Sequence, residues 1–368
     1  MESVYWVLSW ACHRRCDHCY DDRFRPYVRA EFQSLLASSQ STYKRIISNL
    51  PETFLYQDPH HPLPDGRPSE RIGRIILAGG ELLIDGVREG LLYPCLDEIQ
   101  NKYWGLEARI TVQTTGDLLT LQYIEEMLER GVWMIAVSGM DDFHVGLEGD
   151  KRLGLMERIR GMMAAAGVRE VVMGKGQESY LTEAGPFFLF FGAQPKSWIG
   201  EIWPRGRAWS NSLSSADYSV NFCARWSGGK NFLNHGQAGA EVAIEPNGDV
   251  YPCCMKTKVA LGNLTEERLT DILDSLKGHP AFEAINAGDP ERMGEYLDWD
   301  RARFQAESAI TRPDGAAYAN LCMGCDAFFA AHLGEITQKL RSERLAEGAR
   351  RLAARKARFD PTAGLFPE

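Results

Sequence analysis

Three cysteines lie close together near the start of the chain, in the segment Cys12-His-Arg-Arg-Cys16-Asp-His-Cys19. They directly follow an apolar run, Val4 to Trp10, that is typical of a buried strand. Three thiolates on one short loop cannot all pair with one another, so a shared soft metal is the better explanation. Three protein ligands would leave one iron of a four-iron cluster open. The spacing therefore predicts a metal centre with one position left for chemistry.

Composition and charge narrow the class of protein further. The 368 residues are 44% hydrophobic and 25% charged, which suits one large domain plus a smaller one. The nine cysteines favour metal ligation, because we expect a cytoplasmic protein in which thiols stay reduced. The chain has no signal-peptide pattern and no apolar run long enough to span a bilayer, so no membrane partner is expected. A formal net charge of −9 argues against a nucleic-acid partner.

Strand-like and helical patterns alternate over the first half of the chain. The expected strands cover residues 3–10, 74–78, 109–113, 133–138 and 170–173, and the expected helices cover 33–50, 91–103, 119–130 and 153–166. This order predicts parallel strands wrapped by helices. In barrels built this way the site forms at the C-terminal ends of the strands.

The cysteine loop resembles that of the radical S-adenosylmethionine (radical SAM) enzymes, in which the same spacing follows the first strand of a partial barrel. The resemblance implies that Cys12, Cys16 and Cys19 hold a catalytic 4Fe-4S cluster whose open iron binds S-adenosylmethionine. Reductive cleavage then gives a 5′-deoxyadenosyl radical that takes a hydrogen atom from a substrate carbon. His18 stands where the family usually has an aromatic residue, and a histidine can still stack. The alternative is a structural zinc site with His13 or His18 as its fourth ligand.

Turns that follow the predicted strands supply candidate residues for binding S-adenosylmethionine. Glycines let backbone approach the molecule, the Glu81 carboxylate could accept a hydrogen bond from its ammonium group, and a guanidinium could bind its carboxylate. The candidates are Gly79, Gly80, Glu81, Thr115, Ser138 and His18, with Arg205 and Arg207 from Pro204-Arg-Gly-Arg-Ala208. Each turn is common by itself, but together and in family order they favour the cluster interpretation.

The segment Asp141-Asp142-Phe-His144 follows the fourth predicted strand. A histidine beside a carboxylate can move a proton near neutral pH, so His144 and Asp142 are the candidate catalytic residues. The alternative is that Asp141 or Asp142 caps the helix that follows.

A second group of cysteines lies in the C-terminal half. Pro246-Asn-Gly248 predicts a hairpin turn that carries Cys253 back toward Cys223. The arrangement resembles Twitch, a truncated SPASM domain, and this resemblance implies one auxiliary 4Fe-4S cluster. Its proposed ligands are Cys223, Cys253, Cys322 and Cys325, with Cys254 as a possible replacement for Cys253. A zinc ribbon is the alternative, and Cys95 is expected to be a buried apolar residue.

We therefore predict an α/β protein: a partial (β/α)6 TIM-like barrel over residues 1–212, then a small α+β auxiliary-cluster domain over 213–335, built from a β-hairpin plus helix. Residues 336–368 are expected to form an amphipathic helix and tail that packs against the barrel or a partner. The insertion 56–71 is expected to be a surface loop rather than a lid over the cavity.

Three functions remain open from the sequence. The first is a radical SAM enzyme that oxidises a small-molecule natural-product intermediate with help from the auxiliary cluster. The second is a maturase that crosslinks, oxidises or epimerises a ribosomal peptide. The third is a non-catalytic zinc or iron-sulfur scaffold or redox sensor. For the enzymes, the resemblance implies S-adenosylmethionine as cofactor and an electron donor of the flavodoxin or ferredoxin type.

Overall fold

The computed structural model describes residues 1–104, 107–172, 178–192, 201–225 and 227–358. Within these residues the largest element is a nine-stranded sheet in the order β11-β10-β9-β1-β4-β5-β6-β8-β7. The strands are β1 (Ser3–Ser9), β4 (Arg74–Gly79), β5 (Arg109–Thr114), β6 (Val132–Val137), β7 (Arg169–Glu170), β8 (Phe187–Phe190), β9 (Glu241–Ile244), β10 (Asp249–Tyr251) and β11 (Gly262–Asn263). The strands from β9 to β7 are parallel, and β10 and β11 continue the sheet antiparallel. The parallel arrangement confirms the predicted α/β class.

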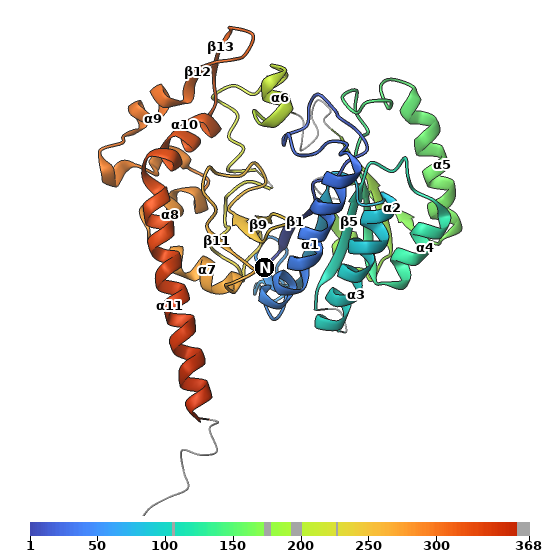
Figure 1. Cartoon of the computed structure of the whole chain (residues 1–368), viewed down its shortest axis with the longest axis horizontal. Helices are drawn as coiled ribbons and strands as arrows, with labels where there is room; N and C mark the ends of the chain where they lie inside the picture. Colours follow the sequence, from blue (N-terminus) through green and yellow to red (C-terminus); the bar gives the residue numbers. More distant parts are fainter. Residues whose placement is uncertain (105–106, 173–177, 193–200, 226, 359–368) are drawn as a thin grey trace, which may run out of the picture.

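Helices cover the outer face of the parallel strands (Figure 1). They are α1 (Arg29–Asn49), α2 (Asp85–Val87), which continues through the π-helical turn η1 (Arg88–Leu92) into α3 (Tyr93–Lys102), α4 (Leu121–Glu129) and α5 (Lys151–Ala165). Every residue of β6 is buried, as expected for a strand in the middle of a parallel sheet. Ile46, Leu96 and Ile124 from the helices pack in one hydrophobic cluster with Trp6 and Ile135 from the strands. The predicted helices and the first four predicted strands are confirmed to within a few residues.

The end of the barrel half differs from the prediction. The strand expected at 170–173 is short, because β7 ends at Glu170 and residues 173–177 lie outside the described residues. An unpredicted strand, β8, pairs with β6 and separates it from β7. The short 3-10 helix η2 (Glu178–Thr182) precedes β8. The Phe-Phe-Leu-Phe sequence of β8 is an aromatic apolar run of strand length, and this was the signal that the sequence offered.

In the insertion between α1 and β4, residues 59–68 form the expected exposed loop, but the residues on either side of it are paired strands. β2 (Leu55–Asp58) and β3 (Ser69–Ile72) pair antiparallel as a hairpin. Asp58 is buried at the loop end of β2, where its carboxylate lies 3.0 Å from the Arg71 guanidinium and 2.9 Å from the His61 ring. Backbone pairing and this buried charge cluster make the insertion an ordered element.

The C-terminal half shares the sheet with the barrel half. β9 and β10 form the predicted hairpin around Gly248, whose φ of +91° favours glycine. β9 also pairs parallel with β1, with Ser3 opposite Glu241 and Trp6 opposite Ile244. The expected boundary near residue 212 therefore does not separate two sheets.

Helices and a small hairpin complete the C-terminal half. They are α6 (Gly206–Ser210), α7 (Leu269–Leu276), α8 (Pro280–Asn286), η3 (Pro290–Arg292), η4 (Glu295–Leu297), α9 (Arg301–Ser308), β12 (Ala309–Thr311) paired with β13 (Ala317–Ala319), α10 (Leu321–Phe328), η5 (Phe329–Leu333) and α11 (Gly334–Arg358). Leu269 and Phe282 lie in the same hydrophobic cluster as Trp6 of β1. One core therefore continues across both halves.

The predicted C-terminal helix is α11, and it packs against α7 of the auxiliary half rather than against the barrel. Arg344 of α11 and Glu267 form a buried ion pair at 2.6 Å, and Arg344 also donates to the Leu261 carbonyl at 3.0 Å. Farther along, α11 projects away from the body of the protein (Figure 1). The predicted helix end near Pro361 lies outside the described residues. Within the described residues, none of the helices combines the length and hydrophobicity needed to cross a membrane.

Candidate active site

The loop with the first three cysteines leaves the end of β1 and is held in place by Arg207. The buried guanidinium donates from Nε to the Cys16 carbonyl at 2.9 Å, from Nη1 to the Asp22 carbonyl at 3.1 Å and from Nη2 to the Phe24 carbonyl at 2.7 Å. Arg207 lines the pocket described below, but these three bonds engage its guanidinium with the chain itself. The expectation that Arg207 binds a cofactor carboxylate is therefore replaced by a role in shaping the cysteine loop.

The three thiols of this loop suit a metal centre. Burial raises the pKa of Cys12 to about 12 and that of Cys19 to about 11, and it raises the pKa of Cys16 as well. The thiols would therefore be neutral near pH 7 unless a cation stabilised the thiolates. A metal supplies that charge and deprotonates its sulfur ligands outright. All three cysteines line one pocket, so a single cluster could contact them together.

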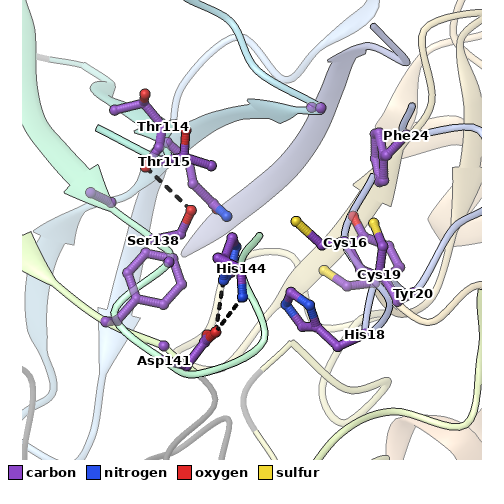
Figure 2. A pocket seen from close by; sticks show the side chains of 18 of the residues that line it. Cys16, His18, Cys19, Tyr20, Phe24, Thr114, Thr115, Ser138, Asp141 and His144 are labelled. Carbon is purple, nitrogen blue, oxygen red and sulfur yellow. Dashed lines mark hydrogen bonds and ion pairs between the residues drawn. The ribbon is translucent and has the colours of Figure 1, made fainter. Parts of the chain in front are cut away.

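This pocket lies along the inner face of the parallel strands and extends to their C-terminal ends, where the cysteine loop and His144 lie (Figure 2). Its volume is about 1530 Å³, including the space at its open mouth. Seven of the candidate residues for the S-adenosylmethionine site and its proton chemistry line it: Gly79, Gly80, Thr115, Ser138, His18, His144 and Arg207. Predicted positions from five separate segments of the chain thus meet in one cavity.

Gly79 and Gly80 are needed for the approach of β4 to the cysteine loop. A Cβ atom on Gly80 would lie 2.2 Å from the Ala11 carbonyl oxygen and 2.7 Å from the Cys12 Cβ. One on Gly79 would lie 2.7 Å from the Ser9 carbonyl oxygen. The backbone of Gly80 donates to that same Ser9 carbonyl at 3.0 Å. The two glycines therefore fit the loop against the strand in addition to lining the pocket.

Glu81 is buried beside the pocket but does not line it. Its carboxylate accepts four hydrogen bonds from the chain: from the Leu83 amide at 3.0 Å, from the Thr114 hydroxyl at 2.8 Å, and from the amide and hydroxyl of Thr115 at 2.8 and 2.6 Å. Glu81 therefore connects the ends of β4 and β5 through these hydrogen bonds. The structure does not bring this carboxylate to the cavity in which an ammonium group would lie.

Thr115 and Ser138 form part of the polar rim. The Ser138 hydroxyl donates to the Thr114 carbonyl at 3.2 Å. The Thr115 hydroxyl lies 2.5 Å from Asp117, whose other carboxylate oxygen contacts His13 at 2.7 Å and Arg14 at 2.6 Å. His13, one of the two alternative zinc ligands, therefore faces Asp117 and does not line the pocket with the cysteines.

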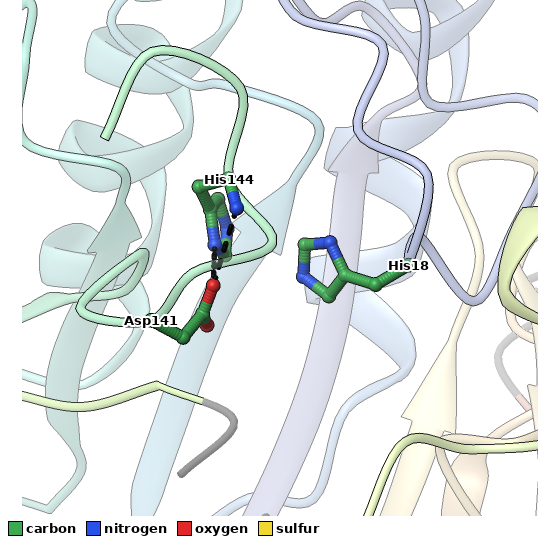
Figure 3. A group of neighbouring side chains, drawn as sticks. All are labelled: His18, Asp141 and His144. Atoms are coloured by element: carbon green, nitrogen blue, oxygen red, sulfur yellow. Dashed lines mark hydrogen bonds and ion pairs between the residues drawn. The ribbon is translucent and has the colours of Figure 1, made fainter. Parts of the chain in front are cut away.

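His18 and His144 lie on the same side of the pocket as Cys16 and Cys19 (Figure 2), and Figure 3 shows the two rings with Asp141. The His144 Nδ1 atom lies 2.8 Å from the Asp141 carboxylate, and the rings of His18 and His144 meet edge to face with centroids 4.5 Å apart. Burial, with a smaller contribution from nearby His144, lowers the pKa of His18 to about 4. His18 is therefore neutral at physiological pH. One ligand atom from each of His18, Asp141 and His144 lies within 4.8 Å of the others, so this group could also hold a metal ion.

The partner of His144 is Asp141, not Asp142 as predicted. Asp142 points outward, with its side chain 68% exposed, and pairs with Arg152. The predicted helix cap is also incorrect, because α5 begins at Lys151 and follows Asp150. Asp141 instead caps the turn that carries His144, accepting from the amides of Phe143 and His144 at 3.0 and 3.2 Å.

The second group of cysteines lines a separate cavity of about 440 Å³. Cys223, Cys253, Cys322 and Cys325 all face it, as predicted for the auxiliary ligands. The last two lie one turn apart on α10, whose N-cap residue Asn320 accepts from the Cys322 amide at 2.9 Å. Burial raises the pKa of Cys322 to about 12 and raises those of the other three, so these thiols also need a cation to ionise. The set fits a metal cluster with four protein ligands.

Cys254 points away from its neighbour Cys253. It is 2% exposed, lines the larger pocket and lies 3.7 Å from the Glu241 carboxylate. The glycine spacing that favoured Cys253 as the ligand thus agrees with the side-chain directions. Cys95 is fully buried in the core, as expected.

Arg205 contradicts the prediction more strongly than Arg207 does, because it lines the auxiliary cavity instead of the larger pocket. Its guanidinium contacts the Asp326 carboxylate at 3.0 Å and donates to the carbonyls of Met255 at 3.2 Å and Cys322 at 3.4 Å. Two arginines only two positions apart therefore serve different sites.

Several pocket residues were missed by the sequence analysis. Thr111 and Gln113 of β5, and Met134 and Ala136 of β6, face the cavity at every second position. The period of two in a strand was the available signal, since alternate residues of a barrel strand point inward. The Thr111 hydroxyl is buried and has no hydrogen-bond partner within the described residues.

Comparison with known proteins supports an iron-sulfur domain in the C-terminal half. Residues 237–292 match the model of SPASM, an iron-sulfur cluster-binding domain. The match includes the β9–β10 hairpin and Cys253, and it ends before Cys322 and Cys325. No curated protein sequence matches this chain.

Several solved structures are similar in overall arrangement. BtrN in complex with AdoMet and 2-DOIA is 13% identical, with 82% of this chain and 92% of that chain covered and a TM-score of 0.41. Native anSMEcpe with bound AdoMet and Cp18Cys peptide is 15% identical, with 92% and 98% covered and a TM-score of 0.42. SuiB of Streptococcus suis bound to S-adenosylmethionine is 10% identical, with 78% and 68% covered and a TM-score of 0.36.

The SPASM match confirms the predicted iron-sulfur domain in the C-terminal half. With the Cys-x3-Cys-x2-Cys loop after β1, the chain resembles radical SAM enzymes that carry such a domain.

Proposed function

We propose that this protein is a radical SAM enzyme that removes a hydrogen atom from a carbon of a small-molecule natural-product intermediate and oxidises it with the help of an auxiliary 4Fe-4S cluster. The observation that carries the proposal is the division of the cysteines into two sites. Cys12, Cys16 and Cys19 of one loop line a large open pocket, which Cys254 also borders from the other half of the chain, and four cysteines line a separate, smaller cavity. Three protein ligands leave a cluster one open iron for S-adenosylmethionine, whereas four leave none.

Different residues of the pocket would bind the cluster and S-adenosylmethionine. Cys12, Cys16 and Cys19 would hold the catalytic cluster, which with S-adenosylmethionine supplies the radical chemistry. Gly79 and Gly80 give the wall the close backbone surface against which a ligand can lie. The further contacts that we assign to S-adenosylmethionine come from Thr115, Ser138 and the neutral ring of His18.

His144 is suited to take a proton from the substrate. Asp141 lies beside Nδ1 and favours the tautomer in which that atom carries the hydrogen, so Nε2 is left as an acceptor. A substrate hydroxyl or amine next to the carbon radical could give its proton to Nε2. Loss of a hydrogen atom, a proton and an electron together gives a double bond to carbon, such as a carbonyl. The electron would pass to the auxiliary cluster.

The inner wall supports a small polar substrate. Thr111 offers a buried hydroxyl without a partner in the described part of the chain, and Gln113 lies two residues farther along the same strand. A buried polar group left unpaired is costly, so a ligand that bonds to it gains affinity and orientation. A substrate with hydroxyl or amino groups would satisfy both side chains.

The test is reconstitution without oxygen, followed by reduction with dithionite in the presence of S-adenosylmethionine. We expect about eight irons per chain and release of 5′-deoxyadenosine. Cys16→Ala should abolish the release, and the control Cys95→Ala, a buried cysteine outside both cavities, should retain it. Zinc in place of iron, or no nucleoside, would overturn the proposal and favour a metal-binding scaffold. Candidate small molecules and short peptides, screened with the active sample, then decide the substrate class.

A further inference from the structure

The turn from Pro204 to Arg207 lies between the two cysteine sites. Gly206 has a φ of +53°, and a Cβ atom there would lie 2.5 Å from the backbone of Tyr20 in the catalytic loop. On one side of this glycine Arg207 holds the catalytic loop, and on the other side Arg205 reaches the auxiliary cavity. The turn is therefore fixed against one site while it presents a cation to the other.

The environment of Arg205 is enclosed. Its side chain is 16% exposed, and its nitrogens contact the Asp326 carboxylate and the carbonyls of Pro204, Met255 and Cys322. A guanidinium keeps its charge under all ordinary conditions. The cavity wall therefore includes a permanent positive charge that cannot move away or be neutralised by losing a proton.

Lys256 is the other cationic side chain that lines this cavity in the described residues, but its charge is directed elsewhere. The ammonium group lies 2.8 Å from Asp21 and 3.0 Å from Glu245. Two carboxylates therefore compensate Lys256, whereas Asp326 is the one carboxylate within ion-pair distance of Arg205 among the described residues. Asp326 also lies 3.9 Å from the exposed Lys258 ammonium group. Asp326 directly follows Cys325 in the sequence, so this carboxylate also lies near the thiolates.

We propose that Arg205 raises the reduction potential of the auxiliary cluster and that Asp326 opposes it, so that this buried pair sets how readily the cluster accepts an electron from the substrate. The inference rests on the proposed function, because it requires iron at the four cysteines. A cluster with four thiolates is anionic, and reduction adds one more negative charge. A fixed cation beside it favours the reduced form, and a fixed anion disfavours it. Arg205 is a positioning residue here, since it acts through the cluster and does not touch substrate.

The test is a potentiometric titration followed by electron paramagnetic resonance. A Cys16→Ala background removes the catalytic cluster, so that the signal reports the auxiliary cluster alone. Arg205→Gln should move the midpoint potential to more negative values, and Asp326→Asn should move it to more positive values. Arg225→Gln is the matched control, because Arg225 follows Cys223 by two positions but is 41% exposed and paired with Glu201. It removes the same charge where solvent screens it, so its midpoint should stay near that of the background protein.

The outcomes separate this inference from the proposed function. Opposite shifts for the two variants, with little change for Arg225→Gln, support it. An unchanged or more positive potential for Arg205→Gln overturns it, even if S-adenosylmethionine cleavage by the unmodified protein has been shown. If Arg205→Gln fails to retain iron, the midpoint potential of Asp326→Asn is the test: a more positive value supports the inference, and an unchanged or more negative value overturns it. If the background protein itself binds no iron, both the inference and the proposed function fall.

Discussion

The two cysteine sites differ in how the chain supplies their thiols, although each groups several thiols around one cavity. The catalytic loop takes three thiols from eight consecutive positions and places them in the wall of an open cavity of about 1530 Å³. The auxiliary site gathers four thiols from Cys223 to Cys325 around a cavity of about 440 Å³. Because one short loop supplies all three thiols, the other segments of the fold can form a pocket beside a metal bound there, and that metal would stay accessible to a ligand. The smaller volume of the auxiliary cavity leaves less room for a substrate beside a bound cluster, which suits electron transfer better than substrate binding.

The largest effect that would test this contrast is the loss of one site without the other. Cys16→Ala should remove about four irons and all nucleoside formation. Cys322→Ala should also remove about four irons but leave S-adenosylmethionine cleavage in place, because its thiol lines the other cavity. Iron analysis beside quantification of 5′-deoxyadenosine checks both. Loss of cleavage in Cys322→Ala with its catalytic iron still bound would show that the two sites do not act separately.

A smaller but still large effect is expected where Arg207 organises the catalytic loop. Arg207→Met leaves the buried carbonyls of Cys16 and Phe24, and the partly buried carbonyl of Asp22, without their charged donor, so we expect a loss of about 3 kcal/mol in the free energy of unfolding. The urea midpoint of the apoprotein measures it. The exposed arginine variant Arg225→Met should change the free energy by no more than about 0.5 kcal/mol. Equal effects of the two substitutions would contradict the role given to Arg207.

Glu81 tests whether a carboxylate beside the pocket stabilises the fold or binds S-adenosylmethionine. Glu81→Gln places an amide donor opposite groups that themselves donate, and we expect a loss of about 2 kcal/mol in the free energy of unfolding. Glu89→Gln, at an exposed carboxylate, is the control and should be near neutral. Thermal denaturation of the apoproteins measures both. If Glu81→Gln leaves stability unchanged but weakens S-adenosylmethionine binding, then Glu81 acts as the sequence suggested.

The smallest expected effect concerns Glu241 on β9, whose carboxylate lies 3.7 Å from the Cys254 thiol. Burial raises the pKa of this carboxyl above its value of 4.5 in the unfolded chain. A raised pKa means that the folded state holds the proton more tightly, so the contribution of Glu241 to stability is lost as the pH rises through the folded pKa. Glu241→Gln keeps a neutral group and should be more stable than the unmodified protein by roughly 2 °C near pH 8, with a smaller gap near pH 5. A gap that narrows as the pH rises would refute the raised pKa.

What the sequence predicted well depends on short-range pattern. The strand before Cys12, the hairpin at Gly248 and the grouping of the auxiliary cysteines all follow from spacing, and the structure agrees. The directions of Arg205 and Arg207 do not follow from spacing, because residues two apart in an irregular turn can face different surfaces. In the same way, Asp141 and Asp142 are neighbouring residues of the same type, so the sequence does not show which one contacts His144. The conformation of the turn places Asp141 beside His144 and Asp142 beside Arg152.

The neighbours of β1 bear on when the catalytic loop can form as the chain is made. β1 lies between β4 and β9, and its pairing with β9 joins Ser3 to Glu241 across more than two hundred residues. Pairings of such long sequence separation form late, and a strand without its neighbour exposes an edge that can aggregate. We therefore expect that the loop of Cys12, Cys16 and Cys19 is synthesised before β9 and reaches its final position only after β9 has paired with β1. Iron delivery to that loop would then have to wait for the second half of the chain.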